Sequence, residues 1–209
     1  MEIISGLEWR YATKKFDPKK KIPAAVLAEL KKAVQLSASS YGLQPYRVLQ
    51  IDDDQIRAKL LSASFEQSQV VDASHLFVFC SQKTVNSQDV AAYFDLKAHM
   101  NGLDSNIFKD AVTVVSEEVA KKSEVEMEIW TAKQTYLAVG TLLAAAGEAA
   151  VDACPMEGFE PDQYDKILGL SPKGLTANVV IALGYRAADD QTAQMRKTRK
   201  PLERLFEHY

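Results

Sequence analysis

Hydrophobic residues along the chain recur at two spacings, one typical of helices and the other of buried strands. After Pro23, apolar residues stand at positions 26, 27, 30 and 34, and this period predicts a helix that ends near residues 37–40. Short apolar runs predict strands instead, because a strand covered on both faces has no polar side. The expected strands span residues 46–51, 76–80, 151–154 and 175–185, and further helices are expected over 54–63, 90–100, 105–120, 123–149 and 161–168.

The longest expected helix, over residues 123–149, opens with a capping-box pattern in which Glu126 follows Ser123. Its second half, LAVGTLLAAAG, is apolar nearly all round, which predicts burial on most sides. In a chain of 209 residues, burial that complete suggests a partner subunit. Small residues at positions 140, 144 and 145 would let another helix approach closely.

The order of the elements indicates an α+β fold in a single domain that spans residues 1–209. About four strands and six or more helices follow one another without a regular βαβ alternation. Neither GxGxxG nor GxxxxGK[ST] occurs in the sequence, which disfavours a Rossmann or P-loop fold.

Composition excludes several classes of function. The formal net charge of −3 argues against general nucleic-acid binding. The longest uncharged stretch, residues 135–147, is shorter than the ~20 residues that span a bilayer, and the first residues lack the pattern of a signal peptide. We therefore expect a soluble, cytoplasmic protein. Cys80 and Cys154 are expected to be buried thiols, and the three histidines show neither a catalytic-triad nor a metal-ligand spacing, so no metal is expected.

Two cationic clusters stand far apart in the sequence. RYATKKF occupies residues 10–16, and RKTRK occupies residues 196–200. Such runs are usually solvated surface. Their spacing alone favours that interpretation, and convergence of the two clusters on one bound anion is the alternative.

Six segments together resemble a known family over nearly the whole chain. They are RYATKKFD at 10–17, ASSYGLQPYRV at 38–48, VVDASHLFVFC at 70–80, WTAKQTYLAVGTLLAAA at 130–146, CPMEGF at 154–159, and the K-x-R of Lys197 and Arg199. In this order the chain resembles the FMN-dependent nitroreductase family, in particular its oxygen-insensitive NAD(P)H nitroreductases and dihydropteridine reductases.

The resemblance implies a central, mostly antiparallel sheet flanked by helices, in an intertwined homodimer. The long apolar helix would form the dimer core, and the C-terminal tail would wrap the partner. It also implies non-covalent FMN, with NAD(P)H as co-substrate. Hydride would pass through flavin N5 by a ping-pong mechanism to a nitroaromatic, quinone or related small-molecule acceptor. No side chain is then expected to act as an essential acid or base.

The same resemblance assigns roles to individual residues. Arg10, Lys197 and Arg199 would bind the FMN phosphate, and Lys14 would contact the flavin ring near N1. The backbone N–H of Glu157 or Gly158 would face N5, and Ser39 and Ser40 would reach the flavin of the other subunit. The full set of implied cofactor-binding residues is Arg10, Tyr11, Ala12, Lys14, Ser39, Ser40, Glu66, Gln69, Gln134, Pro155, Glu157, Gly158, Lys197 and Arg199, with Lys14 and Gln69 also facing the nicotinamide or the substrate.

The chain departs from the family pattern at three of these positions. Ala12 replaces a common serine, Glu66 replaces a common asparagine, and Gln69 replaces a lysine of some relatives. Residues 82–122, which shape the pocket mouth in the family, match poorly. Two other functions therefore stay open, a flavin store or sensor without nicotinamide turnover, and a helical dimer that binds another phosphorylated ligand or none.

Overall fold

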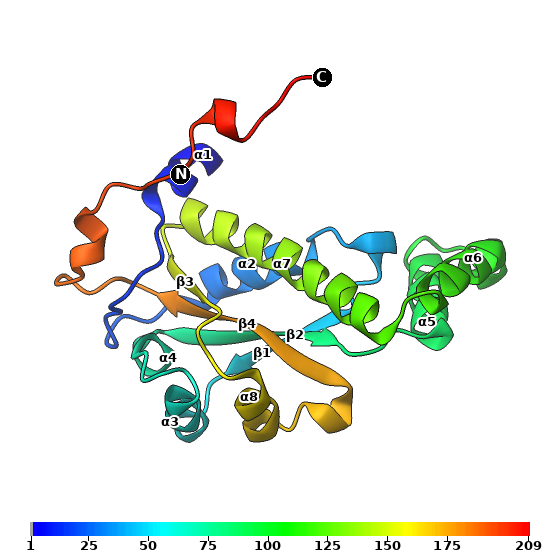
Figure 1. Ribbon diagram of the computed structural model, residues 1–209, viewed down its shortest axis with the longest axis horizontal. Helices are drawn as coiled ribbons and strands as arrows, with labels where there is room; N and C mark the ends of the chain where they lie inside the picture. Colours follow the sequence, from blue (N-terminus) through cyan, green and yellow to red (C-terminus); the bar gives the residue numbers. More distant parts are fainter. Residues whose placement is uncertain (1) are drawn as a thin grey trace.

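A four-stranded antiparallel sheet forms the centre of the computed structural model, which describes residues 2–209 (Figure 1). The two long apolar runs form the inner strands. Their residues are buried almost without interruption, as expected of strands that are covered on both faces of a sheet. The expected α+β fold with an antiparallel sheet is confirmed. The strands are β1 (Tyr46–Ile51), β2 (His75–Gln82), β3 (Asp152–Met156) and β4 (Leu175–Gly184), in the order β1-β2-β4-β3.

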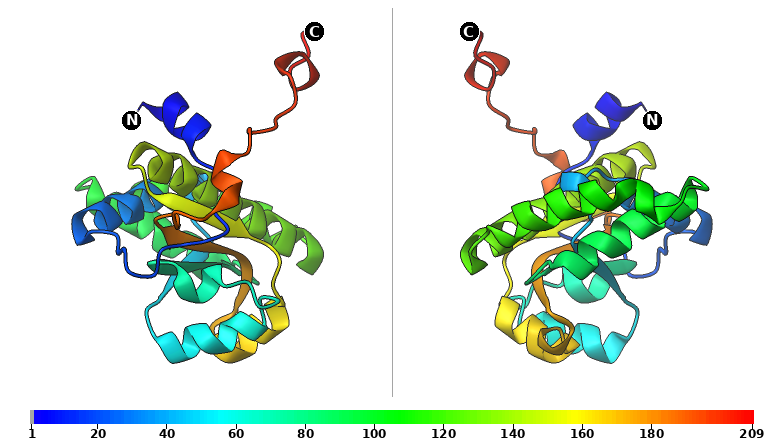
Figure 2. Two further views of the ribbon diagram at one scale, coloured as in Figure 1. Left: turned by 90° about the vertical axis from the view of Figure 1, so that its left-hand side faces the viewer. Right: turned by 90° about the vertical axis from the view of Figure 1, so that its right-hand side faces the viewer.

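Helices cover both faces of the sheet and one of its ends (Figures 1 and 2). Helices α2 (Ala24–Gln35) and α7 (Glu124–Glu148) pack on one face. Helices α3 (Asp54–Ser62), α4 (Gln69–Asp72) and α8 (Pro161–Leu168) pack on the other, around a second apolar core. Helices α5 (Ser87–Met100) and α6 (Lys109–Ala120) form a smaller third cluster with the start of α7.

Helix α7 begins where its capping box was expected. The Ser123 hydroxyl accepts a hydrogen bond from the Glu126 backbone N–H at 3.3 Å, and the Glu126 carboxylate accepts one from the Ser123 N–H at 2.8 Å. One side of the helix is buried against the sheet. The other side leaves Ile129, Tyr136 and Leu137 about half exposed, at 50%, 43% and 51%. Within one protomer, therefore, the apolar second half of α7 is only partly covered.

A short helix, α1 (Ile3–Trp9), precedes the first helix expected from the sequence. No side chain caps its N-terminus, and its seven residues are too few for a stable isolated helix. It forms because it packs on the C-terminal end of α7. A Cβ at Gly6 would lie only 2.7 Å from the backbone of Gly147, so glycine at this crossing permits the contact.

Three further boundaries differ from those expected. Residues 105–120 divide into a 3-10 turn at Ser105–Phe108 and the helix α6. Helix α5 begins at Ser87, three residues earlier than expected, because Asn86 forms a capping box with Asp89. Strand β3 continues to Met156, so Pro155 lies in the sheet and not in a loop.

The C-terminal tail leaves the body of the molecule after β4 and runs back past α1 (Figures 1 and 2). It holds only two 3-10 turns, Gln191–Gln194 and Leu202–Arg204. Leu202, Leu205 and Phe206 are more than half exposed. Among residues 2–209, no helix has the length and apolar character needed to cross a membrane.

Candidate functional site

The two cationic clusters meet in one pocket. Arg10, at the end of α1, lies across this pocket from Lys197 and Arg199 of the tail. The pocket has a volume of about 500 Å³. The structure therefore brings together the three cations that the resemblance assigns to a phosphate. The lining residues are Glu8, Trp9, Arg10, Tyr11, Ala12, Pro155, Thr192, Ala193, Met195, Arg196, Lys197 and Arg199.

The electrostatics of this pocket suit an anionic ligand. The Nε of Arg10 is buried and has no hydrogen-bond partner. Burial, and then the charge of Arg199, lower the pKa of Arg10. Burial and the charges of Arg10 and Arg199 likewise lower the pKa of Lys197. An anion among these groups would satisfy the unpaired donor and relieve the repulsion between the three cations.

Lys197 also attaches the tail to the N-terminal helix. Its Nζ donates hydrogen bonds to the backbone carbonyls of Leu7 and Arg10. The last carbonyls of a helix lack partners within that helix, so a cation placed there satisfies them. A single lysine thus contributes charge to the pocket and holds its two walls together.

Asp190 organises the backbone that follows Arg10. Its Oδ2 accepts hydrogen bonds from the Tyr11 hydroxyl at 2.9 Å and from the Lys14 N–H at 3.0 Å. Burial alone would raise the pKa of Asp190, but hydrogen bonds from Tyr11 and from backbone N–H groups hold it below its usual value. Burial and the bond to Asp190 raise the pKa of Tyr11 to about 12, so Tyr11 stays protonated and donates. Sequence reasoning missed Asp190, which carries no motif.

Arg186 and Asp152 form a second support that sequence reasoning missed. The Asp152 carboxylate accepts hydrogen bonds from the backbone N–H and from Nε of Arg186, each at 2.8 Å. The Arg186 guanidinium also lies over the rings of Trp9 and Tyr11, at 4.3 and 4.6 Å from their centroids. The only sequence signal was a charged residue inside the apolar run VDAC, since buried carboxylates require partners.

Lys14 and Gln69 lie around the thiol of Cys154 in β3. Burial raises the pKa of this thiol, while the charge of Lys14, the Gln69 side chain and the charge of Arg10 act to lower it. Gln69 itself is buried, at 5% exposure. An isolated bridge between Ala12 and Ala153 runs the cationic segment alongside β3. The structure therefore gathers the N-terminal site residues, Gln69 and β3 into one region.

A second pocket adjoins the first and shares Pro155 with it. It has a volume of about 490 Å³ and lies between α7 and the strands β3 and β4. The Tyr136 hydroxyl donates a hydrogen bond to the Glu157 carboxylate. Burial and this bond raise the pKa of Tyr136 to about 12. The lining residues are Tyr136, Val139, Gly140, Leu143, Pro155, Glu157 and Val179.

The segment around Gly158 is held by a loop from the other side of the sheet. The Gln67 side chain donates a 2.6 Å hydrogen bond to the Gly158 carbonyl. A Cβ at position 158 would lie 3.2 Å from that amide nitrogen, which favours glycine there. Within this loop, Phe65 and Glu66 both have positive φ, at 54° and 57°, a conformation that is uncommon for residues with side chains.

Ser39, Ser40 and Gln134 form a separate cluster. The Gln134 carboxamide accepts from the Ser40 N–H and donates to the Trp130 carbonyl, both at 2.8 Å. The Ser39 hydroxyl accepts from the Gln44 N–H at 2.9 Å. None of the three lines either of the two pockets described above. Within one protomer, the structure does not bring them to the cationic pocket.

A model of the nitroreductase family matches residues 7–185, most of the chain. The chain belongs to the nitroreductase family. Its similarity to curated nitroreductases extends over almost its full length. An oxygen-insensitive NAD(P)H nitroreductase of Salmonella typhimurium is 30% identical, with 97% of each chain covered, and its counterpart from Enterobacter cloacae is 30% identical with 98% covered. The major NAD(P)H-flavin oxidoreductase of Aliivibrio fischeri is 29% identical, covering 96% of this chain and 95% of its own.

Solved structures share the nitroreductase fold. A putative nitroreductase from Bacillus subtilis superposes with a TM-score of 0.88 at 21% identity, covering 100% of this chain and 99% of its own. A putative nitroreductase from Exiguobacterium sibiricum, solved in complex with FMN, has a TM-score of 0.86 at 20% identity, with 100% and 98% covered. The family predicted from the sequence is confirmed, and so is its fold.

The three departures from the nitroreductase pattern have different surroundings. Ala12 lines the cationic pocket, and its backbone is bridged to Ala153 of β3. Glu66 is exposed in the left-handed loop beside Gly158. Gln69 is buried against Cys154 and lines neither of the two adjoining pockets.

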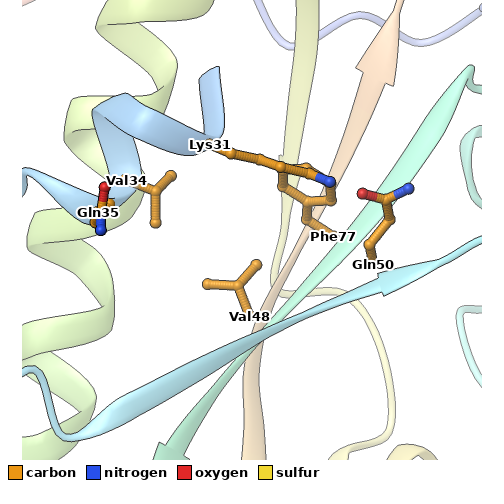
Figure 3. Close-up of a pocket in the computed structure, with 6 residues that line it drawn as sticks. All are labelled: Lys31, Val34, Gln35, Val48, Gln50 and Phe77. Atoms are coloured by element: carbon orange, nitrogen blue, oxygen red, sulfur yellow. The ribbon is translucent and has the colours of Figure 1, made fainter. Parts of the chain in front are cut away.

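A third hollow, of about 350 Å³, lies away from all of these residues (Figure 3). It separates α2 from the outer strand β1 and has an apolar floor. Figure 3 shows Lys31 reaching across it toward Gln50. No residue that the resemblance assigns to the cofactor lines it; the lining residues are Lys31, Val34, Gln35, Val48, Gln50 and Phe77.

Proposed function

We propose that this nitroreductase-family protein is an NAD(P)H-dependent flavin oxidoreductase with FMN as its non-covalent cofactor. The observation that carries the proposal is the buried, unpartnered Nε of Arg10 beside Arg199 and Lys197. A phosphomonoester carries about −1.5 to −2 charges near neutral pH. Two guanidinium forks and one ammonium supply the charge and the donors that such a group needs.

The rest of the cofactor would extend from this pocket along β3. When bound, FMN supplies two-electron chemistry, accepting hydride from NAD(P)H and passing electrons to an acceptor. Lys14 would hold a positive charge near the ring, where it would favour the reduced form of the cofactor. The backbone at Glu157 and Gly158, held by Tyr136 and Gln67, would direct an N–H at the reacting nitrogen.

The acceptors would be nitroaromatics, quinones or related small molecules. Nicotinamide and acceptor would use in turn the pocket lined by Pro155 and Glu157, as in a ping-pong mechanism. The resemblance implies that Lys14 and Gln69 face the nicotinamide or the acceptor, although neither lines the two pockets within one protomer. No side chain is assigned an acid or base role.

We also propose that the chain is a single domain that forms an intertwined homodimer. The half-exposed apolar side of α7 would be the dimer core. A partner would bring its Ser39 and Ser40 to the cofactor, which explains why these residues lie apart from it within one protomer. The exposed tail would wrap the other subunit, and the hollow between α2 and β1 offers it an apolar surface (Figure 3).

A flavin store or sensor is the second candidate, because Gln69 turns inward to Cys154 where some relatives offer a lysine. Anaerobic addition of NADH or NADPH separates the two. Rapid bleaching of the flavin absorbance supports the oxidoreductase, and a flavin that stays oxidised supports the store.

The visible absorption spectrum of the purified protein tests the cofactor directly. We expect an oxidised-flavin spectrum with about one FMN per chain. The double substitution Arg10→Ala with Arg199→Ala should remove most of the flavin, because it deletes both forked donors.

The matched control is Lys15→Ala with Lys200→Ala. It makes the same charge change in the same two segments, but neither residue lines the pocket. Equal flavin content in the two double variants would contradict the phosphate assignment.

A further inference from the structure

The guanidinium of Arg186 is enclosed by the two residues that flank Arg10. Trp9 and Tyr11 lie on it at 4.3 and 4.6 Å from centroid to guanidinium carbon. Contacts of this kind between an arginine and an aromatic face are favourable and sensitive to orientation. Arg186 thus contacts the N-terminal segment on both sides of Arg10.

The backbone at Arg10 is extended, with φ −69° and ψ 146°. These angles are those of polyproline II, and the rings on either side of Arg10 both contact Arg186. With Trp9 and Tyr11 both on Arg186, the backbone that carries the Arg10 side chain is held on each side. Arg10 lines the cationic pocket together with Lys197 and Arg199 of the tail.

Arg186 does not compete for the anion, because its own charge is neutralised. Asp152, only 3% exposed, accepts from its backbone N–H and from Nε at 2.8 Å, and contacts Nη2 at 2.6 Å. Arg186 follows β4 and Asp152 begins β3, so the pair is anchored on two neighbouring strands. The contacts of Arg186 with Trp9 and Tyr11 therefore fix the N-terminal segment relative to the sheet.

We propose that Arg186 is a positioning residue that sets the affinity of the cationic pocket for a phosphate group by orienting Arg10 through Trp9 and Tyr11. This inference rests on the proposed function, in which the ligand is FMN. It assigns to Arg186 an effect on the phosphate end of the ligand and none on the ring. That distinction separates positioning from general structural support.

The test compares FMN with riboflavin, which has the same ring and no phosphate. Dissociation constants would be measured by flavin fluorescence on the full-length apoprotein. Arg186→Met keeps an apolar stem but loses the stacking fork. We expect the FMN dissociation constant to rise by about tenfold or more, the equivalent of one charge-assisted hydrogen bond, and the riboflavin constant to change by less than about threefold.

Arg186→Lys keeps the charge beside Asp152 and serves if the methionine variant folds poorly; it should give a smaller loss with the same preference. Arg47→Met, an exposed position on β1, is the matched control and should change neither constant. In an Arg10→Ala background, Arg186→Met should add less than about threefold, because both act through one contact.

Equal weakening of FMN and riboflavin by Arg186→Met, or no weakening at all, would overturn the positioning role. Failure of the proposed function looks different. In that case Arg10→Ala itself would not discriminate FMN from riboflavin, or neither flavin would bind the wild-type chain, and the inference would fall with its premise.

Discussion

Lys197 has two roles in the cationic pocket, and two carboxylates support the segments around it. Lys197 bonds the carbonyls that end α1 and contributes charge to the pocket. Asp190 holds Tyr11 and the backbone of Lys14, while Asp152 neutralises Arg186. These carboxylates keep the walls of the pocket in place and leave Arg10 and Arg199 unneutralised. The balance of charge, and not the count of cations, makes the pocket suitable for an anion.

A pH dependence of FMN affinity follows from Lys197. Burial and the two neighbouring arginines lower its pKa below the ordinary lysine value of about 10.4. Its charge is lost as pH rises through the lowered pKa. Because the bound phosphate favours the charged form, FMN should bind most tightly at neutral pH and more weakly in the alkaline range.

Titrations of FMN and riboflavin between neutral pH and about pH 10 check this expectation, since lysine pKa values fall near that limit. Ionisation of the ring affects both flavins alike, so only the difference between them reports on Lys197. Lys197→Arg is the control, because an arginine stays charged throughout and should flatten the difference. Parallel curves for wild type and Lys197→Arg would exclude Lys197 as the titrating group.

At the level of elements, long periodic segments were predictable and short supported ones were not. Helix α7 has its own capping box, and β4 has a continuous apolar run, so local chemistry specifies both. Helices α1 and α4 have seven and four residues and no side-chain cap, and they exist only because neighbouring elements hold them. The local sequence of α1 or α4 gives no sign of the neighbouring elements that stabilise these helices.

The contact between α1 and α7 should depend on the glycines at their crossing. In Gly6→Ala, the added methyl would lie 2.7 Å from the backbone of Gly147, which cannot rotate away. Overpacking of this kind costs about 1–3 kcal/mol, partly offset by the gain of about 1 kcal/mol in helix propensity. We expect a lower free energy of unfolding in urea and a loss of flavin affinity, since Arg10 ends this helix.

Ser5→Ala is the control on the same helix, where the side chain is exposed. Its effect should stay within about 0.5 kcal/mol, as is usual for surface substitutions. If Gly6→Ala behaves like Ser5→Ala, the close packing of α1 on α7 does not contribute to stability.

At the scale of the whole molecule, the fold keeps two groups of the implied cofactor-binding residues apart. Gln134 accepts a hydrogen bond from Ser40, and Ser39 accepts one from Gln44, away from Arg10 and its pocket. The half-exposed side of α7 and the projecting tail are the surfaces that a second copy would cover. The proposed homodimer connects these observations, because it would place the two groups of residues on one ligand.

Leu137→Lys tests the dimer core. Leu137 is 51% exposed in the protomer, so a lysine there is harmless to the isolated fold. In a dimer built on α7 it would bury an unpaired charge, which costs several kcal/mol. Light scattering after gel filtration should show monomers of normal helical content with weakened flavin binding.

The control for this variant is Gln163→Lys, an exposed position on α8, across the sheet from α7. It should remain dimeric. A dimeric Leu137→Lys variant would place the interface elsewhere on the molecule.

The amino-acid sequence by itself determined the α+β class, the long capped helix, all four strands and the membership of the nitroreductase family. These properties rest on local periodicity, on caps and on segments whose order is visible in one dimension. Only the tertiary structure decided that Arg10 meets Arg199 and Lys197, that Asp152 binds Arg186, and that Asp190 binds Tyr11. Those contacts join residues more than thirty positions apart, and their energies depend on burial and orientation, which exist only after the chain has folded.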